Sequence, residues 1–553
     1  MSDQAAVGDI VAAFLECCGV ETAFGVISIH NMPILDAIGR RGKIRFVPAR
    51  GEAGAGNMAD AHARVGGGLG VFVTSTGTGA GNAVGAMVEA QTAGTPLLHL
   101  TGQIETAHLD RDRAYIHEAR DQLGMLTAVS KAAFRVRSAE TALGTLKAAV
   151  RTAFTAPSGP VSVEIPIDIQ EAKIPWPQDL DPHGVETPAP TSAALDRLAD
   201  NLARAKRPLL WLGGGSRHAG SAAARLADMG FGIVTSVQGR GILPEDHPRS
   251  LGAFTMAPAV EAFYRTADAM LVAGSRLRGN ETLKYKLKLP QPLYQIDADP
   301  RSDGRCYPNA QFVHGDSAVA LSGLADRLAG RLDVDPDFGD DLAAARRQAE
   351  QGLRDTLGPY AQLVDALQNV AGRSFVWVRD VTISNSTWGN RALRISGPRD
   401  GVHALGGGIG QCLPMGIGAA LAAQGRKTFC LVGDGGFQLS LGELATAAQE
   451  RADIVLLVMN SRGYGVIKNI QDARFGGRKY YADLLTPDFA EVCAAVGVPY
   501  MRLENLDNAA GALSEAAAVD GPALVEVDMA AVGDFAQPFA GPPVRAKVLE
   551  PAK

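Results

Sequence analysis

The most informative part of this sequence is residues 431–471, LVGDGGFQLSLGELATAAQERADIVLLVMNSRGYGVIKNIQ. A strand-like apolar run opens it, and a second one, IVLLVMN, ends at Asn460. Between the two lies an Ala-rich segment in which Ser440 and Glu443 have the spacing of a capping box, which predicts a helix that runs to about Arg451. A strand, helix, strand unit of this kind predicts a parallel sheet.

The turn after the first of these strands carries a carboxylate among glycines. Gly433, Gly435 and Gly436 surround Asp434, and glycines let a backbone approach a bulky anion without Cβ clashes. Because a right-handed crossover places consecutive parallel strands side by side, Asp434 should meet Asn460, 26 residues later, at the carboxyl edge of the sheet. One carboxylate, one amide oxygen and a nearby carbonyl suit Mg²⁺ that holds a diphosphate. The alternative is a simple tight turn with a strand-end cap; the spacing and context favour the metal site.

The rest of the chain repeats this alternation of short strands and Ala-rich helical stretches. It predicts an α/β protein with three doubly wound parallel-sheet domains. A proline-rich stretch at 174–192 and a charged segment at 333–354 interrupt the alternation. We therefore expect an N-terminal domain at 1–175, a central Rossmann-like domain at 190–335 and a C-terminal diphosphate- and magnesium-binding domain at 355–553.

The composition excludes several classes of partner. The 553 residues are 46% hydrophobic and 20% charged, with a net charge of −6, so electrostatics predicts no nucleic acid partner and no membrane partner. No apolar run approaches the roughly 18 residues that span a bilayer, and the opening MSDQAAVGDI does not resemble a secretory leader. We expect a cytoplasmic protein.

These motifs resemble those of the thiamine-diphosphate-dependent 2-oxo acid decarboxylases and acetohydroxyacid (acetolactate) synthases. The signature of that family, GDG followed by Asn after one strand–helix–strand unit, reads Gly433–Gly435 to Asn460 here. The resemblance runs along the whole chain, including LPEDHPRSLG at 243–252. It implies a pyrimidine-binding N-terminal domain, and it implies that Asp434, Asn460 and the main-chain carbonyl of Arg462 bind the metal.

The family also needs a carboxyl group bonded to N1′ of the cofactor's aminopyrimidine. In RFVPARGEAGAGNMADAHAR, residues 45–64, Glu52 stands at that place, at the start of a helix. The alternative is an ordinary helix N-terminal glutamate that the macrodipole favours; its position in a matching chain favours the cofactor contact. Many relatives have a histidine just before this glutamate, whereas this chain has Gly51, so a proton relay through that histidine is absent.

A third match is GGGIGQCLPMGIGAAL, residues 406–421. The resemblance implies that Ile409 is the apolar wedge that bends the cofactor, and that the carbonyl of Gly407 accepts from its 4′ amino group. Tyr464 and Ile467 follow the metal loop and are expected to border the cofactor. For these apolar side chains the alternative is ordinary core packing.

The resemblance implies that polar residues near the first strands face the substrate. His30 and Asn31 follow FGVISI, where relatives usually carry Pro-Gly, and His117 lies in AYIHEARDQ. We predict all three as catalytic candidates, with a solvated loop as the alternative. The run STGTGAGN at 75–82 is closer to benzoylformate decarboxylase than to the synthases.

The glycine run in the central domain, Gly213–Gly215, could indicate a site for a nucleotide cofactor. Gly213–Gly215 lacks the GxGxxG spacing and its acidic partner, which argues against a nicotinamide dehydrogenase. Some family members hold FAD in this domain, but residues 273–283 do not resemble their flavin-contacting stretch. FAD is possible and not favoured.

The resemblance implies magnesium- and thiamine-diphosphate-dependent decarboxylation of a small 2-oxo acid, followed by carboligation as in acetolactate synthase. The alternatives are a non-ligating decarboxylase of the benzoylformate type, another C–C bond-cleaving lyase or hydrolase, and a catalytically silent relative. Family sites are shared between subunits, which implies a homodimer or homotetramer. The C-terminal tail, 532–553, is expected to fold over the site.

Overall fold

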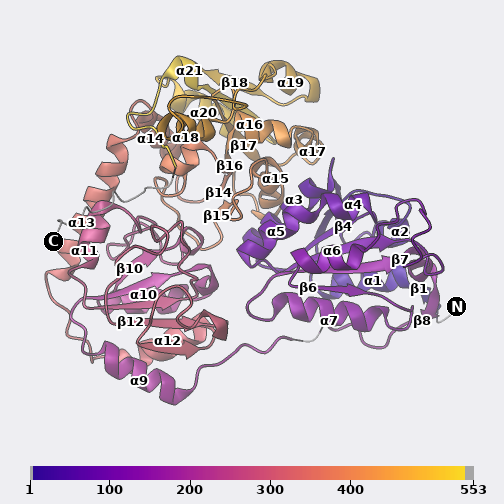
Figure 1. Ribbon diagram of the computed structural model, residues 1–553, viewed down its shortest axis with the longest axis horizontal. Helices are drawn as coiled ribbons and strands as arrows, with labels where there is room; N and C mark the ends of the chain where they lie inside the picture. The colour runs from indigo at the N-terminus through magenta and orange to yellow at the C-terminus, as the bar shows by residue number, and fades with distance from the viewer. Residues whose placement is uncertain (1–3, 183, 542–553) are drawn as a thin grey trace.

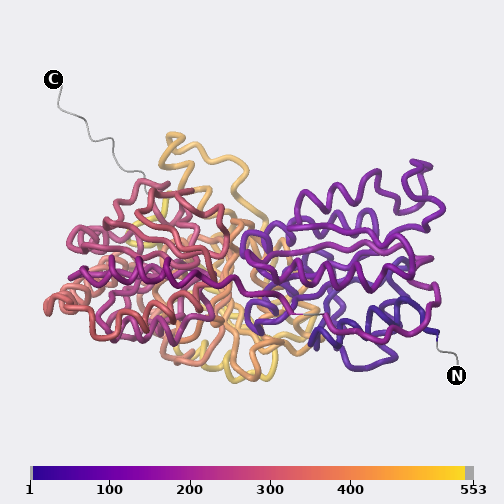
Figure 2. The backbone as a smooth tube through the Cα atoms, turned by 90° about the horizontal axis from the view of Figure 1, so that it is seen from below, coloured from indigo at the N-terminus to yellow at the C-terminus, as the bar shows by residue number. Residues whose placement is uncertain are grey.

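The computed structural model describes residues 4–182 and 184–541. Three parallel sheets, each flanked by helices, lie in the N-terminal, central and C-terminal parts of the chain, which confirms the predicted fold class (Figure 1). The N-terminal part forms one end of the molecule and the central part the other (Figure 2). The C-terminal tail predicted to fold over the site is residues 532–553, and its residues 542–553 lie outside the described residues.

The N-terminal sheet has the strand order β3-β2-β4-β5-β7-β6, all parallel. Its strands are β2 (Thr22–Gly25), β3 (Arg45–Pro48), β4 (Gly70–Thr74), β5 (Leu97–Gln103), β6 (Ala132–Arg135) and β7 (Pro160–Pro166). The helices that flank it include α1 (Val7–Cys17), α2 (Met32–Arg41), α3 (Glu52–Gly66), α4 (Thr78–Asn82), α5 (Val84–Ala93) and α7 (Ala142–Phe154). Outside the sheet, β1 (Gln4–Ala6) pairs antiparallel with β8 (Lys173–Pro175). This pairing ties together the two ends of the proposed 1–175 domain.

The central sheet has the order β10-β9-β11-β12-β13. Its strands are β9 (Pro208–Leu212), β10 (Gly232–Thr235), β11 (Ala269–Ala273), β12 (Leu293–Asp297) and β13 (Gln311–His314). One face is covered by α9 (Ser192–Leu202), α10 (Gly220–Asp228) and α12 (Ser317–Leu328). The other is covered by α11 (Pro258–Tyr264) and α13 (Phe338–Asp355). The charged segment after residue 333 therefore forms a long helix whose apolar side packs on this sheet.

The C-terminal sheet has the order β15-β14-β16-β17-β19-β18. Its strands are β14 (Val376–Arg379), β15 (Gly401–His403), β16 (Thr428–Gly433), β17 (Ile454–Asn460), β18 (Tyr500–Leu503) and β19 (Ala523–Asp528). One face packs on α14 (Tyr360–Ala371) and α20 (Ala509–Ala518). The other packs on α15 (Cys412–Ala422), α17 (Glu443–Gln449) and α19 (Phe489–Val496).

The N-terminal and C-terminal parts share one hydrophobic core, built largely where α3 packs on α15. The two helices approach closely because Gly418 has no side chain: a Cβ atom there would lie 1.9 Å from the carbonyl oxygen of Met58. Interiors are packed too densely to absorb such a clash without moving one helix. The relative position of the two sheets is therefore defined by direct helix contact.

A buried ion cluster supports this junction and gives a stability prediction. Arg64 pairs with Asp60 and Glu89, at 2.5 and 2.8 Å, and donates to the carbonyl oxygen of His403 on β15. Arg64→Ala leaves two buried carboxylates unpaired, so we expect the apparent free energy of unfolding to fall by about 3–5 kcal/mol, measured by urea denaturation. Removal of the exposed Arg40 is the control, and an equal loss there would contradict the expectation.

Candidate active site

The two segments predicted to bind the metal, the turn at Asp434 and the loop at residues 460–463, lie side by side. β16 and β17 are adjacent, with Gly433 opposite Met459, so Asp434 lies beside the end of β17. The carboxylate of Asp434 is fully buried and accepts hydrogen bonds from the backbone N–H groups of Ser461 (3.0 Å) and Gly463 (2.7 Å). Burial raises the pKa of Asp434, and these two hydrogen bonds oppose that shift. The carboxyl edge of the sheet thus brings Asp434 and the loop after Asn460 together.

The other predicted metal ligands lie on the same loop. Asn460 accepts from the N–H of Arg462 through Oδ1 (3.0 Å) and donates to Glu526 Oε1 on β19 (2.7 Å). The carbonyl oxygen of Arg462 accepts from the ammonium group of Lys468, at 2.9 Å. Arg462 has a φ of 53°, in the left-handed region.

These donors fit a hard divalent cation. They are a carboxylate, an amide oxygen and a carbonyl, and the carbonyl already binds a positive charge. Among the described residues no group of three His, Cys, Asp or Glu side chains could hold a metal, so a cation here would depend on amide and carbonyl oxygens. Glu526 and Lys468 were missed from the sequence, because neither lies in a motif and only the folded sheet brings them to this loop.

The loop with the predicted apolar wedge borders the metal loop. Gly407 and Gly410 have φ values of 84° and 82°, which favour glycine, and Ile409 between them is 38% exposed. The N–H of Gly410 donates to Asp380 Oδ2 (2.7 Å), and a Cβ atom on Gly436 would lie 2.7 Å from the same oxygen. The glycine turn after β16 and the 407–410 loop therefore meet at one carboxylate.

Asp380 was not predicted as a site residue. It follows β14 directly, and burial raises its pKa to about 7 against opposing backbone hydrogen bonds, that from Gly410 first. A perturbed carboxyl group at the carboxyl edge of a parallel sheet is typical of a functional site. The signal in the sequence was the aspartate that ends FVWVRD.

Tyr464 and Ile467 lie at the start of α18 (Gly465–Arg474). The ring of Tyr464 packs over Gly435, where a Cβ atom would lie 2.8 Å from two ring carbons. Ile467 is 46% exposed on the same helix. Tyr464 therefore contacts the glycine turn directly, and the cofactor contact predicted for Ile467 stays a prediction.

Glu52 is the first residue of α3, at the carboxyl edge of the N-terminal sheet. Its carboxylate accepts from Asn82 Nδ2 (3.1 Å), and a Cβ atom on Gly79 would lie 3.2 Å from Oε1. The STGTGAGN run thus lies directly against the predicted cofactor glutamate.

The substrate-facing candidates differ in environment. His30 and His117 have ring centroids 5.1 Å apart. Burial chiefly lowers the pKa of His30, His117 adds to this, and the carboxylate of Glu105 opposes it. The side chain of Asn31 is buried. Its Oδ1 accepts from the N–H of Ser28 and its Nδ2 donates to the carbonyl oxygen of Val26, so this amide holds the loop in place. The catalytic role predicted for Asn31 stays a prediction, and Glu105 was missed.

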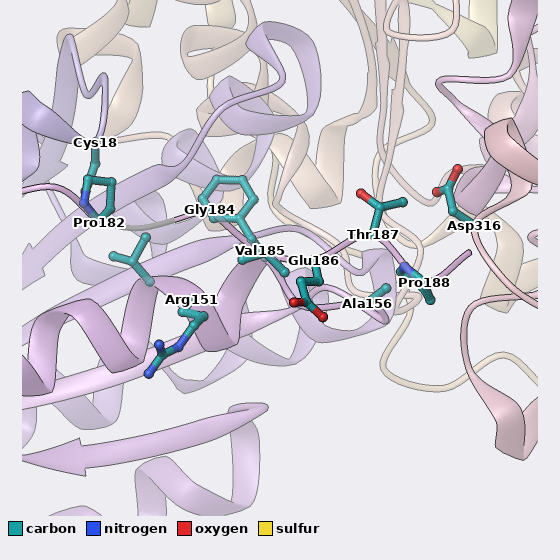
Figure 3. A pocket seen from close by; sticks show the side chains of 12 residues that line it. Cys18, Arg151, Ala156, Pro182, Gly184, Val185, Glu186, Thr187, Pro188 and Asp316 are labelled. Atoms are coloured by element: carbon teal, nitrogen blue, oxygen red, sulfur yellow. The ribbon is translucent and has the colours of Figure 1, made fainter. Parts of the chain in front are cut away.

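One cavity borders two of the predicted metal ligands, and a second lies away from all the predicted site residues. The first cavity, of about 400 Å³, is lined by Asn460, Arg462 and residues 484–489, among others. Another of about 400 Å³, between α7 and the linker, contains none of the predicted residues; Arg151 and Glu186 are among those lining it (Figure 3).

The central glycine run has a structural reason. A Cβ atom on Gly213 would lie 2.2 Å from the carbonyl oxygen of Gly274, so the loops after β9 and β11 can meet only through glycine. A cavity of about 510 Å³ beside it is lined by several arginines, Arg217 and Arg276 among them.

No helix in the part of the chain that the structure describes is both long and apolar enough to cross a bilayer.

Comparison with known proteins identifies the family. Models of thiamine pyrophosphate enzymes match residues 5–125 (N-terminal TPP binding domain), 195–324 (central domain) and 382–527 (C-terminal TPP binding domain). The probable 2-ketoarginine decarboxylase AruI of Pseudomonas aeruginosa is 31% identical, covering 94% of this chain and 93% of that protein. The acetolactate synthase of Mycobacterium bovis is 27% identical, covering 93% and 86%, and the acetolactate synthase isozyme 1 large subunit of Escherichia coli is 27% identical, covering 94% and 93%. The chain therefore belongs to the thiamine pyrophosphate enzyme family, and it is a thiamine-diphosphate-dependent 2-oxo acid enzyme that forms or cleaves carbon–carbon bonds.

Proposed function

We propose that Asp434, Asn460 and the carbonyl of Arg462 hold Mg²⁺, and that the N–H groups around Gly433, Gly435 and Gly436 bind the diphosphate of thiamine diphosphate. The observation that carries this proposal is the meeting of the Asp434 carboxylate with the loop after Asn460. When bound, the cofactor supplies the electron sink for loss of carbon dioxide from a 2-oxo acid.

The remaining residues orient the cofactor. When the cofactor is bound, Glu52 would bond N1′ of the aminopyrimidine, Ile409 would be the apolar side chain against its rings, and the carbonyl of Gly407 would accept from the 4′ amino group. Tyr464, which packs over Gly435, and Ile467, half-exposed on α18, border the cofactor.

We propose a homodimer or homotetramer in which two subunits complete each site, in the cytoplasm. In support, large apolar side chains are exposed near both sets of site residues. Those near His30 and His117 are Ile27, Ile29, Met32 and Ile116, and those near the 407–410 and metal loops are Leu439, Ile467, Phe475 and Leu485. Exposed apolar patches of this kind are typical of surfaces that another protein covers.

The two main candidate functions, carboligation and simple decarboxylation, differ in the product that leaves the enzyme: a 2-hydroxyketone or an aldehyde. The adjacent rings of His30 and His117 can pass a proton to the reacting carbon, which favours simple decarboxylation. Similarity to acetolactate synthases over more than nine-tenths of the chain favours carboligation. Purified protein with magnesium and thiamine diphosphate should be incubated with pyruvate, benzoylformate and 2-ketoarginine, and aldehydes separated from hydroxyketones. Hydroxyketone alone would remove the decarboxylase candidate, aldehyde alone would remove the carboligase, and neither product from any substrate would contradict the proposal.

The carboxylate of Glu105 suggests the substrate class. It acts on the pKa of His30, and its Oε2 is buried without a hydrogen-bond partner among the described residues. The Glu105 side chain is 40% exposed and its Oε2 lies 3.9 Å from His108 Nε2, so it can be reached from solvent. A carboxylate beside the substrate-facing histidines favours a cationic substrate side chain such as the guanidinium of 2-ketoarginine.

Glu105→Gln tests this directly. A hydrogen bond to a charged group contributes about 1.5–3 kcal/mol, so we expect kcat/KM for 2-ketoarginine to fall roughly 10- to 100-fold while that for pyruvate changes little. Glu118→Gln is the control: it removes a charge from the same loop, while the amide oxygen can still accept from the N–H of Tyr115. An equal loss with both substrates would contradict the assignment.

A further inference from the structure

Glu443 was expected to cap its own helix together with Ser440, and this prediction is wrong. The hydroxyl of Ser440 has no hydrogen-bond partner among the described residues. The helix predicted after Ser440 is α17, which begins at Glu443, and a separate helix, α16 (Asp434–Leu439), precedes it. The Glu443 side chain points instead to another part of the chain. It is 4% exposed, so its carboxylate needs partners.

Those partners are backbone groups of the N-terminal part. Glu443 Oε1 accepts from the N–H groups of Arg50 (3.1 Å) and Gly51 (3.1 Å), and Oε2 lies 3.2 Å from the Arg50 nitrogen. Oε2 also accepts from Thr446 Oγ1 (2.6 Å), one turn along α17. Thr446 therefore holds the carboxylate in the orientation that reaches residues 50 and 51.

Arg50 and Gly51 immediately precede α3, whose first residue is Glu52. No side chain of the residue before α3 caps this helix, so its first N–H groups rely on outside acceptors. A carboxylate at this end also interacts favourably with the helix dipole. Glu443, from the C-terminal part of the chain, accepts from the N–H groups of the two residues that lead into α3 and places its carboxylate at this end of the helix.

The contact has a matching feature in α3. A Cβ atom on Gly54 would lie 2.1 Å from Glu443 Oε1 and 2.8 Å from its carboxyl carbon. Gly54 is helical, where alanine would ordinarily be the more favourable residue. The glycine leaves the space that the carboxylate occupies, so two distant positions are shaped for one contact.

We propose that Glu443 is the positioning residue for Glu52: it fixes the start of α3 and thereby the direction in which the Glu52 carboxyl group points. This rests on the proposed role of Glu52. Because Glu443 follows α16, whose first residue is Asp434, the same contact joins the glycine turn at Asp434 to the helix that carries Glu52.

The first test uses protein without cofactor. In Glu443→Ala, amide hydrogen exchange of the peptide covering residues 45–58 should be faster than in the wild type by about tenfold or more, because the capped N–H groups lose their acceptor. Unchanged exchange in this peptide would overturn the proposal.

The second test uses the holoenzyme. A group that orients a functional ligand typically contributes 10- to 100-fold, so we expect Glu443→Ala to slow exchange of the thiazolium C2 proton for deuterium by about that factor, with kcat lowered in parallel and KM nearly unchanged. In a Glu52→Gln background the same substitution should have no additional effect on C2 exchange. Additive losses would show that Glu443 does not act through Glu52, and would overturn the proposal.

Glu450→Ala is the matched control. Glu450 follows α17 and also joins the two parts of the chain, through a 2.6 Å ion pair with Arg45, and its side-chain hydrogen bonds among the described residues are to Arg45 and Gln449. It should leave both exchange rates unchanged. Gly54→Ala adds a second route, since it displaces the Glu443 carboxylate while leaving Glu443 in place; it should reproduce the Glu443→Ala result and keeps the test open if that variant does not fold.

Failure of this inference can be told apart from failure of the proposed function. If Glu52→Gln leaves C2 exchange at the wild-type rate, the proposed function of Glu52 is wrong. If Glu52→Gln abolishes exchange and both Glu443→Ala and Gly54→Ala retain it, the positioning role of Glu443 alone is wrong.

Discussion

Glu52→Gln should leave the fold intact and lower kcat by about 10²- to 10⁴-fold, the range that a well-placed acid–base group contributes. The amide can still lie against Asn82 and Gly79, but it cannot exchange a proton with N1′ of the aminopyrimidine. Turnover by single-substrate assay and far-ultraviolet circular dichroism check the two parts of this expectation.

Glu491→Gln is the control for the alternative reading of Glu52. Glu491 also lies in the first turn of a helix, α19, and is exposed. If Glu52 served only to complement a helix dipole, both substitutions would have small and similar effects on stability and none on turnover. Near-wild-type activity of Glu52→Gln would therefore remove the cofactor contact from the proposal.

Asp434→Asn should abolish magnesium-dependent retention of thiamine diphosphate on desalting. The substitution keeps one acceptor oxygen for the N–H groups of Ser461 and Gly463, so the loop is disturbed little, but the charge that attracts the cation is lost. Since even residues behind a metal ligand contribute about 10- to 100-fold to affinity, loss of the ligand itself should exceed this range.

The measurement is bound cofactor after gel filtration, with and without magnesium. Asp453→Asn is the matched control, because Asp453 precedes β17 at the opposite edge of the same sheet and pairs with Lys427. Equal retention by Asp434→Asn and the wild type would remove the metal assignment, while recovery of Asp434→Asn at high magnesium would support it.

Much of the fold and half of the site could be predicted from local patterns. The strand at 454–460 matches the predicted run IVLLVMN, because alternation between buried strands and small-residue helices is a property of neighbouring residues. The meeting of Asp434 with the loop after Asn460 followed from the same logic, since right-handed crossovers place consecutive parallel strands together.

Other site features could not be predicted, because their partners are far apart in the chain. Asp380 meets Gly410 and Gly436 only when three strand ends share one sheet edge. Glu105 becomes a candidate only because the fold brings its carboxylate close enough to the buried His30 to act on the pKa of that ring. Neither residue stands in a recognisable motif.

Glu443 shows the limit of what local sequence patterns can predict. The letters around it have the spacing of a capping box, and short-range spacing is enough to predict strands, helices, glycine turns and the family of this chain. A buried carboxylate, however, binds whichever unsatisfied N–H groups the packed domains bring within reach. Packing of α3 on α15 brings Arg50 and Gly51 to Glu443 across nearly four hundred residues, so only the tertiary structure could assign its partner.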